Sequence, residues 1–288
     1  MGLPSLSLIA QSVLSGVFIG ALYGLLGLGL SLSWGLLRQI NLAHFALAFL
    51  AAYLCYQLST VGGIDPLLTL VVIVPGFFAL GVAMQWLFAR FEISAFNSLL
   101  VTFGLTVIVE SLIQSIWTAD FRRLESTYGN AKFKLGFLYI PAPELLTLVL
   151  SLSLAFAMWA ALRYTDIGKA LRAAAEDGPI ATAFGVNRQA LALLLSGACA
   201  ALAGVAGVCI ALSYTLAPAQ IYGWIGVVFA AVMMGGLGRP LGPIVAGIVI
   251  GVSESVTMAL TSPSWAPLVS FSLLLLLLIV RPGREGRA

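Results

Sequence analysis

The sequence predicts an all-α protein, a polytopic bundle of transmembrane helices with eight or nine spans. Of its 288 residues, 61% are hydrophobic and 9% are charged, whereas a soluble domain carries about 25% charged residues. So few charges could not cover a water-facing surface, and the mean hydropathy of +1.07 agrees. The charges cluster between long apolar runs, as expected when only those segments reach water. We interpret residues 1–288 as a single transmembrane domain.

Nine apolar runs are candidate spans, because about 20 apolar residues cross the hydrocarbon core as a helix. The first, Leu6–Leu36, is long enough to tilt strongly or to break at its glycines. Two short runs, Phe45–Leu58 and Trp224–Leu237, are candidates for partial or broken helices. The other six runs are Leu67–Phe88, Leu99–Trp117, Leu145–Leu162, Ala190–Tyr214, Ile244–Leu260 and Pro267–Val280.

The positive charges predict an orientation, because Lys and Arg accumulate in cytoplasmic loops. With the loop at about 163–188 placed in the cytoplasm and spans alternating, four basic residues lie outside, all in a loop at about 120–144. The C-terminus is then cytoplasmic. No Lys or Arg precedes Arg38, so the first run lacks the basic start of a signal peptide and is expected to stay as a span. The basic residues on the inside are Arg38, Arg90, Arg163, Lys169, Arg172, Arg188, Arg239, Arg281, Arg284 and Arg287.

The inside loop at 163–188 carries more helix propensity than a linker needs. Lys169–Glu176 reads KALRAAAE, a run of strong helix formers. Gly178 and Pro179 are expected to break this helix, Ile180–Phe184 to resume it, and Gly185 to end it. The sequence therefore predicts a short helix, a turn and a second short helix.

Four polar residues in or beside the apolar runs are candidates for a substrate pathway. Asn41 and His44 stand at the start of a run, where a lone histidine more often caps or packs a helix than serves a function. Glu110 and Glu254 lie inside runs, where an ionisable group is costly and usually faces the bundle interior or a cavity. A structural role is the alternative for all four, and we favour it for Glu110.

Glycine patterns add two expectations about packing. Gly235–Pro243 reads GGLGRPLGP, which is either an ordinary cytoplasmic turn or an interruption at membrane depth of the kind that builds transporter sites. Glycines spaced by four residues predict helices that pack backbone to backbone. These are Gly16, Gly20 and Gly24 in the first run, and Gly247 and Gly251 in a later one.

Patterns for catalysis are missing from the sequence. It has no G-x-x-x-x-G-K-[ST] phosphate-binding loop and no H-E-x-x-H. One histidine and three dispersed cysteines, interpreted as buried hydrophobes, predict no metal site. A net charge of +3 without a basic stripe gives no argument for nucleic acid. We therefore expect a transport subunit embedded in membrane lipid, and not an enzyme.

Four segments, in order, resemble the permease subunit of branched-chain (hydrophobic) amino acid ABC importers, the shorter of two paralogous permeases. The resemblance extends from about Gly16 to Pro282. Phe45 and Ala46 depart from the family, which usually has Gly and then a polar residue after the histidine. The four segments are Gly35–His44 (GLLRQINLAH), Thr165–Asn187, Phe229–Ser255 and Arg281–Arg287.

The resemblance implies an ATP-driven importer in the bacterial inner membrane. Its other parts would be a paralogous second permease, two ATPase subunits that bind ATP and Mg, and a periplasmic or lipid-anchored substrate-binding protein. Branched-chain amino acids are the expected substrates. Urea, short amides or aromatic acids are alternatives, and a secondary transporter or channel is the alternative of another class. The residues expected to couple to the ATPase are Arg172, Ala173, Ala174, Ala175, Glu176, Asp177, Phe184 and Gly185.

Overall fold

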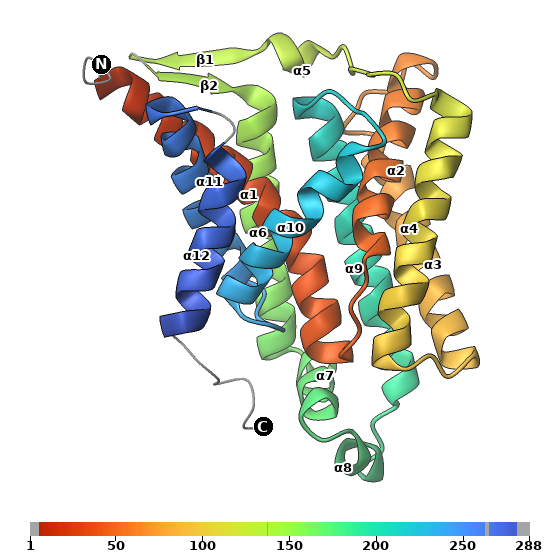
Figure 1. Ribbon diagram of the computed structural model, residues 1–288. Helices are drawn as coiled ribbons and strands as arrows, with labels where there is room; N and C mark the ends of the chain where they lie inside the picture. The colour runs from red at the N-terminus through yellow and green to blue at the C-terminus, as the bar shows by residue number, and fades with distance from the viewer. Residues whose placement is uncertain (1–5, 137, 263–264, 281–288) are drawn as a thin grey trace.

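A computed structural model describes residues 6–136, 138–262 and 265–280 (Figure 1). Long helices form a bundle, with a β-hairpin over one end and two short helices projecting from the other. The helices are α1 (Leu6–Leu37), α2 (Ala43–Thr60), α3 (Leu70–Arg90), α4 (Ala95–Trp117), α5 (Thr127–Asn130), α6 (Ala142–Tyr164), α7 (Asp166–Glu176), α8 (Gly178–Ala183), α9 (Arg188–Ser213), α10 (Gln220–Gly235), α11 (Gly242–Leu260) and α12 (Ala266–Val280).

Every predicted apolar run corresponds to one helix, but fewer of them qualify as full spans than predicted. Within the described residues, six helices are long and apolar enough to cross a membrane: α1, α3, α4, α6, α9 and α11. The prediction of eight or nine spans is therefore too high by this criterion. Helices α2, α10 and α12 account for the difference: α10 and α12 have only 16 and 15 residues, and α2, with 18, is not among the six.

Helix α2 is short because it begins inside the bundle. Its first turn places His44 against Leu26 and Gly29 of α1, which precede the end of α1 at Leu37 by eleven and eight residues. At 1.5 Å per residue, α2 therefore starts about 12–16 Å from that end along the axis of α1. The prediction of a partial helix for this run is confirmed.

Helices α1 and α11 pack backbone to backbone, as the glycine spacing predicts. A Cβ at Gly20 would lie 2.5 Å from the carbonyl oxygen of Gly247, and a Cβ at Gly16 would lie 2.5 Å from the Cα of Val252. No side chain larger than hydrogen fits between these turns. Helix α9 is also heavily buried. Its Cys199 and Cys209 are buried free thiols, as is Cys55 of α2.

The loop predicted at 120–144 contains regular structure. It holds α5 and the antiparallel strands β1 (Lys132–Leu135) and β2 (Leu138–Pro141), with Leu135 paired to Leu138. Gln11 of α1 fastens the hairpin by accepting from the Tyr139 amide at 2.9 Å and donating to its carbonyl at 3.0 Å. The hairpin therefore lies over the end where α1 begins, opposite α7 and α8 (Figure 1).

Candidate functional site

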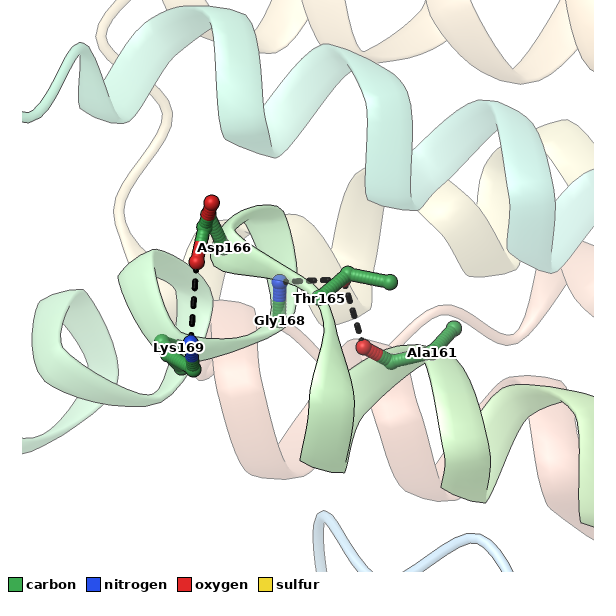
Figure 2. Close-up of polar contacts among 5 residues, drawn as sticks. All are labelled: Ala161, Thr165, Asp166, Gly168 and Lys169. Atoms are coloured by element: carbon green, nitrogen blue, oxygen red, sulfur yellow. Dashed lines mark hydrogen bonds and ion pairs between the residues drawn. The ribbon is translucent and has the colours of Figure 1, made fainter.

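The predicted coupling segment begins where α6 ends, and one hydroxyl fastens the two helices together (Figure 2). Thr165 Oγ1 accepts a hydrogen bond from the Gly168 amide at 3.0 Å, which caps α7, and donates one to the Ala161 carbonyl of α6 at 2.6 Å. Lys169 pairs with Asp166 at 2.9 Å and lowers the pKa of that carboxyl. The first turn of α7 is thus fixed to the last turn of α6.

Gly168 lets α7 approach the backbone of α6. A Cβ at this position would meet the Ala161 oxygen and the Leu162 Cα, and would lie 2.6 Å from the Leu162 oxygen. Those atoms belong to the main chain and cannot swing aside as a flexible side chain can. The angle between α6 and α7 therefore depends on glycine at this position.

The helix–turn–helix predicted for this segment is confirmed, with one correction. The break between α7 and α8 is the single residue Asp177, whose Oδ1 accepts from the Ile180 amide at 3.0 Å and caps α8. Gly178 and Pro179 belong to α8, because proline fits the first turn of a helix, where its missing N–H costs nothing. Gly185, with φ of +86°, follows the end of the helix as predicted.

The residues expected to couple to the ATPase do not share one surface. Ala173, Glu176, Asp177 and Gly185 are exposed, and Phe184 is 85% exposed. Ala174 and Ala175 are half-buried toward α1, where the Arg38 guanidinium donates to the Ala175 carbonyl at 3.2 Å. Arg172 lines a separate cavity with Arg163 and Arg239.

Asn41 and His44 lie together at the start of α2, inside the bundle. His44 is buried, and its Nε2 lies 3.0 Å from the Leu26 carbonyl oxygen of α1. Thr102 of α4 braces the same turn, since its hydroxyl accepts from the Leu42 amide at 3.1 Å. Asn41 is also buried, and its Oδ1 has no hydrogen-bond partner among the described residues. The structure gives His44 a hydrogen bond to the backbone of α1 and leaves one buried oxygen of Asn41 unsatisfied among the described residues.

Glu254 lies in the bundle interior, as expected for an ionisable group in an apolar helix. It is 5% exposed and accepts hydrogen bonds from Tyr23 of α1, at 3.0 Å, and from Ser270 of α12. Tyr23 precedes Leu26 by three residues, so this network and the His44 contact lie at similar depth, about 4.5 Å apart along α1.

Glu110 is in a different place, on the bundle surface. Its carboxylate joins α4 to α10 by accepting from the Tyr222 hydroxyl at 2.6 Å, and it also accepts from the Gln114 amide of its own helix at 3.1 Å. Tyr222 is 39% exposed. Of the four predicted pathway residues, the structure brings together only Asn41 and His44.

The Gly235–Pro243 segment is a turn that packs on the last turns of α1. The Gly238 amide donates to the Ser31 carbonyl at 3.0 Å, and the Ser31 hydroxyl donates to the Gly236 carbonyl at 3.2 Å. Arg239 of this turn is exposed. The turn belongs to the α7 end of the bundle.

Sequence reasoning missed Tyr23, Thr102 and the three-arginine cavity. Tyr23 stands beside Gly24 in the glycine stripe that faces α11, so its position was a usable signal. Thr102 is an ordinary hydroxyl in an apolar run, and nothing in the sequence marks it as a neighbour of α2. Among the described residues, no group of three or more His, Cys, Asp or Glu could hold a metal ion.

Comparisons with known proteins agree over almost the whole chain. The family model described as a branched-chain amino acid transport system permease component matches residues 12–278. The high-affinity branched-chain amino acid transport system permease protein LivH of Escherichia coli K12 is 26% identical over 298 residues, covering 96% of this chain and 95% of LivH. BraD of Pseudomonas aeruginosa, described in the same words, is 24% identical over 302 residues, covering 99% and 98%.

LivH of Methanocaldococcus jannaschii is 29% identical over 266 residues, covering 85% of this chain and 80% of that protein. No solved structure matches the chain. The bundle of membrane-length helices agrees with a multi-pass membrane protein. Because the family model covers residues 12–278, the chain belongs to the family of permease components of branched-chain amino acid transport systems.

Proposed function

We propose that this chain is one membrane-spanning subunit of an ATP-driven importer that moves branched-chain amino acids across the bacterial inner membrane. A periplasmic or lipid-anchored binding protein would deliver the substrate, and a paralogous second permease would complete the pathway. Two ATPase subunits would bind ATP and Mg, so this chain needs no cofactor. The observation that carries the proposal is the α7–α8 segment, which projects from a chain whose family is a transport permease.

The α7–α8 segment is suited to receive force from an ATPase. Thr165 and Gly168 tie α7 to α6, and the Arg38 bond to Ala175 ties its far end to the end of α1. A push on α7 therefore acts on two membrane-spanning helices and is not absorbed by a loose linker. Phe184 offers an exposed aromatic anchor of the kind that dominates interfaces.

This assignment places the α7 end in the cytoplasm. Arg38, Arg163, Lys169, Arg172 and Arg188 all stand at or near this end, which agrees with the positive-inside rule. The hairpin then faces outward, where a binding protein would dock. The C-terminus, which follows α12 and lies outside the described residues, is placed in the cytoplasm by the same rule.

Glu110 supports a location for the second permease. A charged side chain at a lipid-facing helix position costs about 2.5–3.5 kcal/mol on insertion scales, and the Glu110–Tyr222 bridge is exposed on the surface of this single chain. A protein partner or a water-filled pathway would remove that cost. We therefore place the second permease over the α4–α10 face.

The start of α2 supports a place for substrate recognition. Transporter sites are often built where a helix is interrupted at membrane depth, and the positive end of the helix dipole favours an anionic group there. An amino acid carries such a group in its carboxylate. The unsatisfied Asn41 oxygen could accept from the substrate ammonium at the same turn.

The coupling assignment is tested by Phe184→Asp in the complete transporter, reconstituted with its binding protein. ATP-dependent leucine uptake should be lost and the ATPase subunits should no longer co-purify, because a charge replaces the apolar anchor. Phe91→Asp is the matched control, since Phe91 is also exposed and follows α3 near the same end. Normal uptake and co-purification in Phe184→Asp would refute the assignment.

The orientation is tested separately with membrane-impermeant labels. A cysteine at Gly129 should react from outside, and a tag at the C-terminus should be reached only from the cytoplasm. Reaction of both from one side would contradict the proposed topology.

A further inference from the structure

A cavity of about 650 Å³ opens at the α7 end of the bundle, between α6, α7 and the turn that joins α10 to α11. Each of these three elements contributes one arginine to its wall: Arg163, Arg172 and Arg239. Trp159 and the Gly238–Gly242 turn form other parts of the wall, and no carboxylate of residues 6–136, 138–262 or 265–280 lines it. Three positive charges from separate parts of the chain therefore border one space without a counter-charge from these residues.

These three arginines differ from Lys169 and Arg38 at the same end of the bundle. Lys169 pairs with Asp166, and Arg38 donates to a backbone carbonyl. Within the described part of the chain, none of the three guanidinium groups that line the cavity forms an ion pair or a hydrogen bond. Like charges around one space repel each other, and an anion between them removes that cost.

The first turn of α11 adds to the positive character of this cavity. Gly242, its first residue, lines the wall, and no side chain caps the helix. The first amides of a helix have no partner within the helix and favour a nearby anion. The arginine side chains carry the argument, and the helix start reinforces it.

Aromatic side chains place the cavity mouth beside lipid. Phe156 of α6 is 59% exposed and packs against Trp159, with ring centroids 5.2 Å apart. The Arg163 guanidinium lies over the same Trp159 ring, 5.4 Å from its centroid. Tryptophan and tyrosine gather where membrane spans meet the headgroup layer, and long basic side chains reach from there toward water. The outer face of α6 thus leads from the acyl chains to the arginines.

We propose that the cavity lined by Arg163, Arg172 and Arg239 binds a phosphate group, supplied by the headgroup of an anionic phospholipid. Guanidinium groups bind phosphate oxygens in two-pronged fashion, and basic pockets between transmembrane helices on the cytoplasmic side suit lipid headgroups. The volume falls in the range of about 300–1,000 Å³ typical of small-ligand sites. A bound phosphate would connect α6, α7 and the α10–α11 turn; under the proposed function, it would steady the coupling segment.

Native mass spectrometry of the purified transporter, titrated with phosphatidylglycerol, tests this site. The wild-type complex should retain the lipid. Each charge-assisted contact contributes about tenfold to affinity. Arg239→Gln should therefore weaken binding about tenfold, and the Arg163→Gln, Arg239→Gln double variant about a hundredfold. Arg90→Gln is the matched control, because it removes an exposed arginine at the end of α3, outside the cavity. It should bind like wild type.

Further arms of the experiment identify the source of the phosphate. Phosphatidylcholine, which has no net charge, should bind far more weakly than phosphatidylglycerol. If millimolar inorganic phosphate displaces the lipid from wild type, and no such displacement is seen in the double variant, the site also binds free phosphate. Arg239→Lys keeps the charge but not the two-pronged geometry, so it should give an intermediate loss even if the double variant folds poorly. Equal losses in Arg90→Gln and Arg239→Gln, or no loss in either, would overturn the proposal.

Discussion

The contact between Gly168 and α6 permits a sharp test of how α7 is held. In Gly168→Ala the new Cβ would meet the main chain of Ala161 and Leu162, and its distance to the Leu162 oxygen, 2.6 Å, is below the 3.4 Å at which ordinary contacts begin. The two helices must therefore separate by at least about 0.8 Å at this point. Overpacking of this kind costs about 1–3 kcal/mol.

Movement at Gly168 also acts on the cap of α7. The Gly168 amide is the donor to Thr165, and losing a capping bond costs about 0.5–2 kcal/mol. If this cost of about 1–3 kcal/mol destabilises only the transport-competent arrangement of α7, the transport rate drops by about 5-fold to 150-fold. We expect the variant to insert and to be purified at normal yield, because the contact lies at the α7 end of the bundle, at the last turn of α6.

The assay is ATP-dependent leucine uptake in proteoliposomes, measured together with ATP hydrolysis, so that a loss of coupling is distinguished from a loss of ATPase. Gly129→Ala is the matched control. Gly129 also donates its amide to a capping hydroxyl, that of Ser126, but a Cβ there meets only that oxygen, at 3.8 Å. Uptake by Gly168→Ala at the level of Gly129→Ala would refute the idea that the α6–α7 angle matters.

Three further predictions concern the polar residues of the spans. Glu254→Ala should lower the free energy of unfolding by about 1–3 kcal/mol, because it removes the buried acceptor of the Tyr23 hydroxyl; a melting temperature equal to wild type would contradict this. The Asn41→Ala, His44→Ala double variant should lose most uptake at normal expression, and wild-type uptake would remove both residues from the pathway. Glu110→Leu should release the second permease during purification, whereas Gln114→Leu on the same helix should retain it; a stable complex in Glu110→Leu would place the partner elsewhere.

The helices themselves could be predicted well, because composition and run length are enough to define an apolar helix. Depth could not. Phe45–Leu58 was recognised as a short run, but only the packing of His44 against the middle of α1 shows that α2 begins inside the bundle. The sequence of an apolar run does not indicate where its helix starts relative to the neighbouring helices.

Side-chain direction on α7 was likewise beyond the sequence. Arg172 and Ala173 are adjacent and both are exposed, yet only Arg172 lines the three-arginine cavity. The direction depends on the α6–α7 angle, which Thr165 and Gly168 set through contacts that local propensity does not encode. The hairpin was foreseeable in part, since Lys132–Leu135 alternates polar and apolar residues before Gly136, a known strand-and-turn signal.

The glycine contact between α1 and α11 limits how this protein can change shape. Two helices separated by side chains can slide when those side chains change rotamer. At Gly20 and Gly247 no side chain lies between the two backbones, so this adjustment is not available. A slide that carries the glycines of one helix past those of the other would bring residues with a Cβ to a contact where a Cβ has no room. Helices α1 and α11 must therefore move together as one rigid unit. Any opening and closing of the transporter has to occur at contacts between other helices.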